Sequence, residues 1–92
     1  MTSPAPRITV LGLGEDAQLL AVELAQAGAD VIGFDASVRR LPGVSLAESL
    51  AEAVSGADVV LSRTSPMQAR ETARETAALI ADSGAIYVDL NP

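Results

Sequence analysis

The sequence predicts an α/β fold in which one parallel sheet lies between two layers of helices. Short, mostly apolar runs rich in β-branched residues alternate with segments whose apolar residues recur at helical spacing, and glycines punctuate the boundaries. The 92 residues fit one small domain, and 49% hydrophobic residues with a net charge of −6 describe a globular chain. Strands that alternate with helices imply a parallel sheet with right-handed crossovers.

The first predicted element is a buried strand over residues 8–13, which follows a proline-containing tail over residues 1–6 that we expect to be disordered. A helix is predicted over 15–26, because its apolar residues fall on one face, and Gly28 ends it. Those apolar residues are Ala17, Leu20, Ala21, Leu24 and Ala25.

A second strand is predicted over 31–34. The segment after it, 36–43, is broken by Pro42 and is too short for a full crossover helix. We therefore expect the second crossover helix to be shortened or absent, and a short third strand to follow over 43–47.

The rest of the chain predicts a short helix over 49–54, capped by Ser49, and strands over 57–62 and 85–90. Between these strands a longer helix is predicted over 67–82. Its expected apolar face consists of Ala69, Ala73, Ala77 and Ile80. The five strands are expected in the order 3-2-1-4-5, with a ligand crevice where the order reverses, at the ends of strands one and four.

The turn between the first strand and the first helix, "GLGEDA", has the spacing of a dinucleotide-binding turn. Gly12 permits a tight turn, Gly14 leaves the backbone open to a pyrophosphate, and Ala17 is small enough for the helix to pack on the strand. Free amides at a helix N-terminus also attract an anion. The predicted pyrophosphate site comprises Gly12, Leu13, Gly14, Glu15, Asp16 and Ala17.

Two acids in this turn, Glu15 and Asp16, oppose phosphate binding. Unit charges about 5 Å apart in water repel each other by roughly 1 kcal/mol, and by more where solvent is excluded. The alternative interpretation is that both carboxylates stabilise the first turn of a helix whose anion site is empty.

Asp35 ends the second predicted strand, about 20 residues downstream, where a carboxylate can accept hydrogen bonds from ribose hydroxyls. This position favours NAD as the cofactor. Arg39 and Arg40 follow closely and can neutralise a 2′-phosphate, so NADP stays an alternative. In the other interpretation, Asp35 caps a turn and the arginines are solvated.

A third group of candidate residues, Ser62, Arg63 and Thr64, follows the fourth strand, where a loop is expected to run beside the nicotinamide ribose and Met67 to cover the ring. The alternative is a helix start, because a serine before a proline is a typical N-cap followed by the first helical residue. The charged residues of the next helix are expected to form a solvated face of mixed charge. They are Arg70, Glu71, Arg74 and Glu75.

The composition argues against several functions. The chain has no lysine and only two aromatic residues, Phe34 and Tyr87, which argues against binding to nucleic acid. The absence of cysteine and histidine excludes an ordinary zinc site. Because no apolar run approaches about 18 residues and the N-terminus lacks the pattern of a secretion signal, we expect a cytoplasmic protein with no membrane contact.

Four segments, "ITVLGLGEDA", "VIGFDAS", "GVSLAESLAEAVSGADVVLS" and "GAIYVDLNP", together resemble the N-terminal domain of the 6-phosphogluconate and 3-hydroxyisobutyrate dehydrogenase superfamily. The resemblance covers about residues 7–92 and implies a Rossmann-like, NAD(P)-binding domain of a β-hydroxyacid dehydrogenase. It further implies that the turn over 12–17 binds pyrophosphate, that Asp35 faces the adenosine ribose, and that the loop over 62–65 lies along the cofactor.

The sequence departs from that family at Asp16, where an apolar residue is usual, at Ala17, which replaces the third glycine, and at Pro92, which replaces a serine or threonine. The family's catalytic lysine belongs to a helical C-terminal domain, and this chain has neither lysine nor histidine as a general acid or base. We therefore assign no catalytic residue and expect the catalytic domain to be absent or on a partner chain.

By this interpretation the chain is the cofactor-binding module of an oxidoreductase and is catalytically inert alone. The alternative is a non-enzymatic nucleotide-binding or protein-interaction module with a degenerate turn, which associates, as a homodimer for example, through the edge of the fifth strand.

Overall fold

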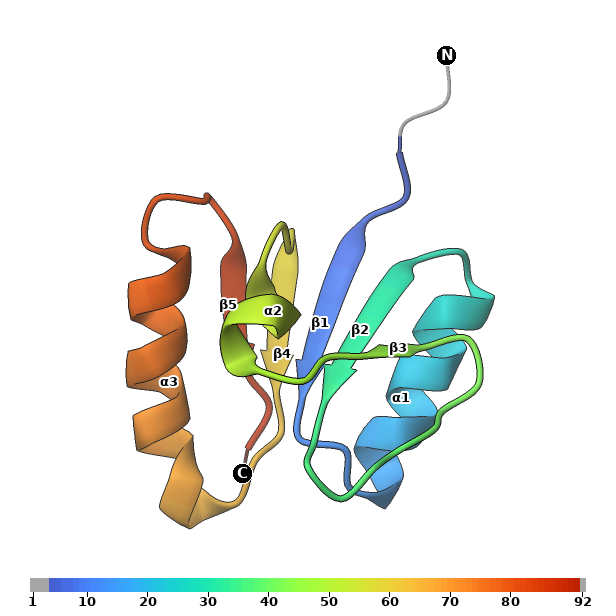
Figure 1. Cartoon of the computed structure of the whole chain (residues 1–92), viewed down its shortest axis with the longest axis horizontal. Coiled ribbons are helices and arrows are strands. Elements are labelled where there is room, and N and C mark those ends of the chain that lie inside the picture. The colour runs from blue at the N-terminus through green and yellow to red at the C-terminus, as the bar shows by residue number, and fades with distance from the viewer. Residues whose placement is uncertain (1–3, 92) are drawn as a thin grey trace.

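The computed structural model describes residues 4–91, which form a five-stranded parallel sheet with helices on both faces (Figure 1). In chain order the elements are β1 (Arg7–Leu11), α1 (Glu15–Gln26), β2 (Asp30–Phe34), β3 (Ser45–Leu46), α2 (Leu50–Val54), β4 (Val59–Ser62), α3 (Pro66–Ile80) and β5 (Ile86–Asp89). The strand order is β3-β2-β1-β4-β5, and every pair is parallel. The predicted fold class and strand order are thereby confirmed.

The predicted first helix matches α1 at both ends, and no helix lies between β2 and β3, as expected for the second crossover. Four of the strands are shorter than predicted, whereas β2 begins one residue earlier than expected. β1 ends at Leu11 because Gly12 takes a φ of 83° and leaves the extended conformation. The first three residues of the expected N-terminal tail, and Pro92, lie outside the described residues.

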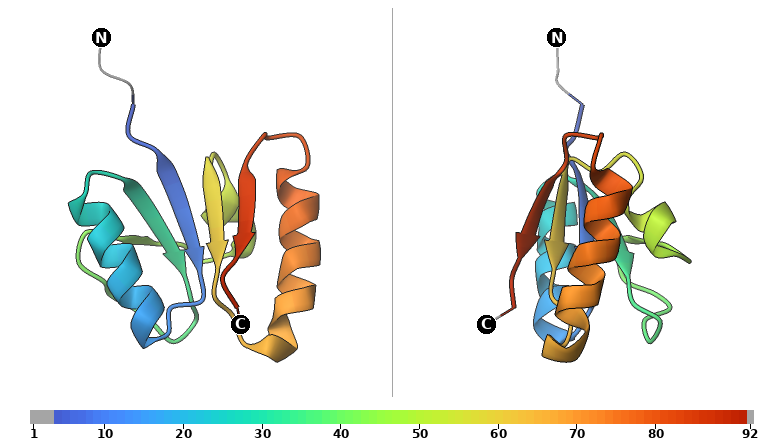
Figure 2. Two further views of the ribbon diagram at one scale, coloured as in Figure 1. Left: turned by 180° about the vertical axis from the view of Figure 1, so that it is seen from behind. Right: turned by 90° about the vertical axis from the view of Figure 1, so that its left-hand side faces the viewer.

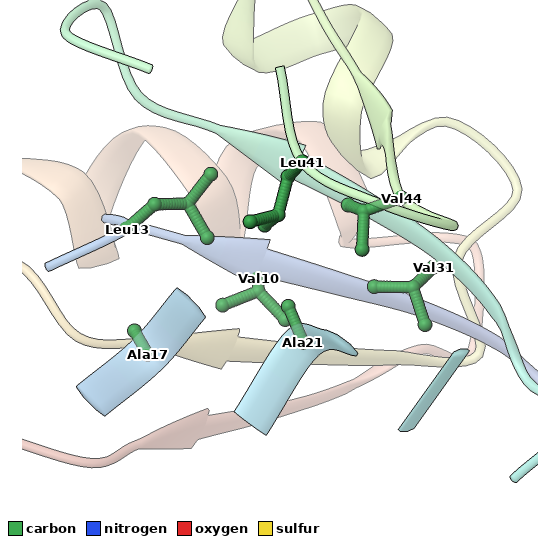
Figure 3. Packing of buried hydrophobic residues seen from close by; sticks show 7 residues of the cluster. All are labelled: Val10, Leu13, Ala17, Ala21, Val31, Leu41 and Val44. Atoms are coloured by element: carbon green, nitrogen blue, oxygen red, sulfur yellow. The ribbon is translucent and has the colours of Figure 1, made fainter. Parts of the chain in front are cut away.

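α1 packs on one face of the sheet through small residues. Ala17 and Ala21 are 3% and 0% exposed, so the helix approaches β1 and β2 closely, as the predicted apolar stripe requires. Figure 3 shows Leu13 pointing into the same cluster as Val10 and Val31. Gly33 in β2 makes room for it, since a Cβ there would lie 2.8 Å from a methyl carbon of Leu13. The glycine-rich turn is therefore anchored in the core by its own leucine.

α2 and α3 cover the opposite face, so that α2 lies in front of the sheet in Figure 1 and behind it in the reverse view of Figure 2. The core on this side joins Leu11 and Val60 of the sheet to Ala53 and Ile80 of the helices. Ser49 caps α2 by accepting a hydrogen bond from the Glu52 N–H at 3.1 Å.

The predicted apolar face of α3 is wrong at Ala77, which is exposed, while Thr76 is completely buried. Two successive steps of four residues, from Ala69 through Ala73 to Ala77, drift around a helix of 3.6 residues per turn. A step of three from Ala73 to Thr76 restores the direction toward the sheet, and Ile80 follows at the next step of four.

Candidate functional site

The glycine-rich turn after β1 touches the loop after β4. A Cβ atom built on Gly12 would lie 2.3 Å from the carbonyl oxygen of Arg63, so only glycine leaves room for this backbone approach. Both loops are predicted from the sequence to lie at the crevice where the strand order reverses. The structure brings them together at the carboxyl ends of neighbouring strands.

The N-terminus of α1 opens at this crevice. Gly14 is its N-cap residue and provides no side-chain cap, and a Cβ there would meet only an Asp16 carboxylate oxygen, at 3.8 Å. Gly14, Glu15 and Asp16 are all exposed. Backbone N–H donors in the first turn of a helix lack intrahelical partners and carry roughly half a positive charge. The turn therefore offers backbone donors to an anion beside Gly14, but the Asp16 carboxylate already accepts a hydrogen bond from the Ala17 N–H at 2.9 Å.

Asp16 forms an ion pair with Arg63 across the crevice, with 2.8 Å between a carboxylate oxygen and a guanidinium nitrogen. The side chains are 64% and 40% exposed, so the pair contributes at most about 1 kcal/mol to stability. Arg63 also donates a hydrogen bond to the Leu90 carbonyl at 3.0 Å. The sequence predicts that the charge of Asp16 opposes the binding of a pyrophosphate. In the structure, the guanidinium of Arg63 partly balances this charge.

Asp35 connects the end of β2 to the glycine-rich turn. One carboxylate oxygen accepts a hydrogen bond from the Leu13 N–H at 2.7 Å, and the other accepts one from the Ser37 N–H at 2.8 Å. The second bond is a local turn of the kind that the alternative interpretation of Asp35 described. The first bond joins residues distant in sequence and holds the turn in place. Asp35 therefore has a structural role in addition to any contact with a ligand.

A cavity of about 630 Å³ begins at this crevice and extends along α3. It is lined by Gly12, Asp35 and Thr64, which belong to three separate predicted groups of site residues. The other lining residues are not among those predicted from the sequence; they are Leu11, Phe34, Ala36, Ser37, Leu50, Gln68, Glu71, Thr72 and Glu75. The four residues from α3 recur at helical spacing from Gln68, and this spacing was the signal available in the sequence.

Other predicted site residues lie elsewhere. Ser62 is completely buried at the end of β4, and its hydroxyl has no hydrogen-bond partner among the described residues. The Leu13 side chain is also in the core, so only its backbone faces the crevice. Arg39 is exposed and lines a second hollow of about 470 Å³ on the β3 side of Asp35. Met67 is 94% exposed.

The start of α3 agrees in part with the alternative interpretation of the loop after β4, in which a serine before a proline begins a helix. Pro66 occupies the first turn and Ser65 is the N-cap residue, but the serine hydroxyl makes no capping hydrogen bond.

Within residues 4–91, no group of three or more acidic side chains could hold a metal ion. No helix in that part of the chain is long and apolar enough to cross a bilayer.

The chain matches no protein-family model and no curated protein, but it is similar to parts of several solved dehydrogenases. A D-isomer specific 2-hydroxyacid dehydrogenase from Xanthobacter autotrophicus Py2 is 28% identical over 99% of this chain, with a TM-score of 0.82. A structure of such an enzyme from the same organism in complex with NADPH is 30% identical over 94% of this chain, with a TM-score of 0.79. A 3-hydroxyisobutyrate dehydrogenase from Mycobacterium tuberculosis is 28% identical over 95% of this chain, with a TM-score of 0.82.

This chain spans only about a third of each of those proteins: 32%, 29% and 32% of their lengths. The similarities support a Rossmann domain of the kind found in NAD(P)-binding dehydrogenases. They include two types of hydroxyacid dehydrogenase at equal identity and do not separate them.

Proposed function

We propose that this chain is the nicotinamide-dinucleotide-binding module of an oxidoreductase of the β-hydroxyacid dehydrogenase type. The observation that carries the proposal is the cavity that joins Gly12, Asp35 and Thr64 beside the N-terminus of α1, where the N-cap residue Gly14 has no side chain. The amides of the turn would hold the pyrophosphate, and Asp35 would accept hydrogen bonds from the adenosine ribose. The preferred cofactor is NAD, because a carboxylate at the ribose repels a 2′-phosphate.

The residues present fit such a cofactor. Gly14 exposes backbone where a phosphate must approach, and Arg63 supplies a guanidinium beside the same helix end. The bound nicotinamide would supply hydride chemistry, while this chain binds and orients the dinucleotide. We assign the groups that hold the hydroxyacid and transfer its proton to residues outside these 92, on a further domain or a partner chain. The cytoplasmic location stays a prediction.

Titration calorimetry with NADH and with NADPH tests this function. We expect heat of binding with NADH and a Kd in the micromolar range or weaker, because one domain buries only part of a dinucleotide. A chain that gives no heat with either nucleotide, at concentrations up to several millimolar, would refute the proposed function.

Asp16→Asn is expected to strengthen NADH binding about two- to fivefold. Removing one negative charge about 5 Å from the pyrophosphate relieves a repulsion of roughly 1 kcal/mol and leaves Arg63 without a competing carboxylate. Loss of the exposed ion pair should change the free energy of unfolding by less than about 1 kcal/mol. The matched control is Glu23→Gln, an exposed carboxylate in the last turns of α1, which should leave NADH affinity unchanged. Weaker NADH binding by Asp16→Asn would mean that Asp16 serves to position Arg63.

A second candidate function is association through β5. Within the described residues this strand pairs only with β4, and Ile86 on it is 60% exposed. An unpaired strand edge with an exposed apolar residue is a template for strand pairing with a second copy. Sedimentation at several protein concentrations distinguishes association through β5 from cofactor binding alone. A strict monomer that binds NADH contradicts the edge-mediated function.

A further inference from the structure

We propose that Glu71 and Glu75 on α3 determine the cofactor specificity of this chain by disfavouring dinucleotides that carry a 2′-phosphate. This inference rests on the proposed function, and the sequence alone predicts both residues to lie on a solvated helix face. Both glutamates line the same cavity as Asp35 and Gly12.

The geometry follows from the helical repeat of α3. Gln68, Glu71, Thr72 and Glu75 are spaced by three, one and three residues, which places them on one side of the helix. The opposite wall of the cavity comes from the end of β2 and the residues just after it, Asp35 to Ser37. A dinucleotide whose ribose reaches Asp35 would therefore place its adenosine half between that wall and α3.

The charges on the cavity wall are all of one sign. Asp35, Glu71 and Glu75 are acidic, and no arginine is among the lining residues. Arg63 is engaged by Asp16, outside the cavity wall, and Arg39 lines the second hollow. Among the described residues, the cavity wall itself thus has three acids and no cation, and Arg39 lies in the second hollow, which shares Asp35 with the cavity.

NADH and NADPH share every group except the 2′-phosphate, so the difference in their affinities isolates this effect. A phosphate monoester carries a charge of about −1.5 to −2 at neutral pH. Across roughly 10 Å of water, partly screened by salt, two carboxylates are expected to weaken NADPH binding by about three- to tenfold. Asp35 adds to this preference from the other wall.

The test is the double variant Glu71→Gln/Glu75→Gln, with NADH and NADPH affinities measured by calorimetry for it and for the unmodified chain. We expect NADPH to bind about three- to tenfold more tightly to the variant, while NADH affinity changes by less than about twofold. The gain should shrink at about 1 M ionic strength, where the Debye length is only about 3 Å. Both glutamates are exposed, so the substitutions should leave the fold intact.

The matched control is Glu23→Gln/Asp82→Asn, which makes the same change in net charge at exposed positions outside the cavity wall. An equal gain in NADPH affinity in this control, or no gain in the Glu71→Gln/Glu75→Gln variant, overturns the inference while leaving the proposed function standing. Failure of the unmodified chain to bind NADH removes the proposed function, and the inference falls with it.

Discussion

Gly12→Ala is expected to lower the free energy of unfolding by about 3–5 kcal/mol and to abolish NADH binding. An alanine at a φ of +83° costs about 1–2 kcal/mol in backbone strain alone. Its Cβ would also lie 2.3 Å from the Arg63 carbonyl oxygen, and the loop after β4 must move to relieve that overlap. The movement separates the two loops that form the crevice. Urea denaturation measures the first effect and NADH titration the second.

Gly84→Ala is the matched control for this variant. Gly84 has a φ of +79°, close to that of Gly12, but a Cβ there meets nothing within 4 Å. This substitution carries the backbone strain without the overlap, so it should cost only about 1–2 kcal/mol and leave NADH affinity unchanged. Equal losses of stability in the two alanine variants would show that the close approach of the Arg63 backbone contributes nothing.

Local patterns were sufficient to predict most of the fold. The glycines and the 3.6-residue repeat mark where elements start and end, so α1 was predicted at both ends and the strand order followed from general rules of parallel sheets. Boundaries were less accurate where the strand-like run continued past the last ladder hydrogen bond. Leu13 is apolar, as a strand residue would be, but its side chain enters the core from the turn after Gly12.

The candidate site was predictable where motifs and the predicted strand order place residues at one crevice, as for Gly12, Asp35 and Thr64. The spacing of Gly12 and Asp35 follows the dinucleotide-binding pattern, and the structure joins both residues in one cavity. The contact between Asp16 and Arg63 depends on which strands are neighbours, and no local pattern encodes its distance. Which side of α3 faces the cavity depends on the rotation of that helix about its axis. Ala77 was wrongly predicted to face the sheet, so the expected orientation of the helix, and with it the position of the acidic residues, was rotated from the observed one.

Asp35→Ala is expected to weaken NADH binding by at least tenfold and to destabilise the chain by about 1–3 kcal/mol. The binding loss follows from removing an ionised acceptor for the ribose hydroxyls, since such hydrogen bonds contribute about 1.5–3 kcal/mol and 1.4 kcal/mol is tenfold in affinity. The stability loss follows from the Leu13 N–H, which is partly buried and loses its acceptor at 2.7 Å. The Ser37 N–H is exposed and can bond to water instead.

Asp35→Asn separates the charge of this side chain from its hydrogen bonds. Asparagine keeps one carbonyl oxygen, which can accept from Leu13 or from Ser37 but not from both, so its stability should lie between those of the unmodified chain and Asp35→Ala. It should also narrow the gap between NADH and NADPH affinities, because one of the three carboxylates on the cavity wall is neutralised. Unchanged NADH affinity in both Asp35 variants would limit Asp35 to its structural bond with the glycine-rich turn. In that event the ribose would have to be held by other residues of the cavity.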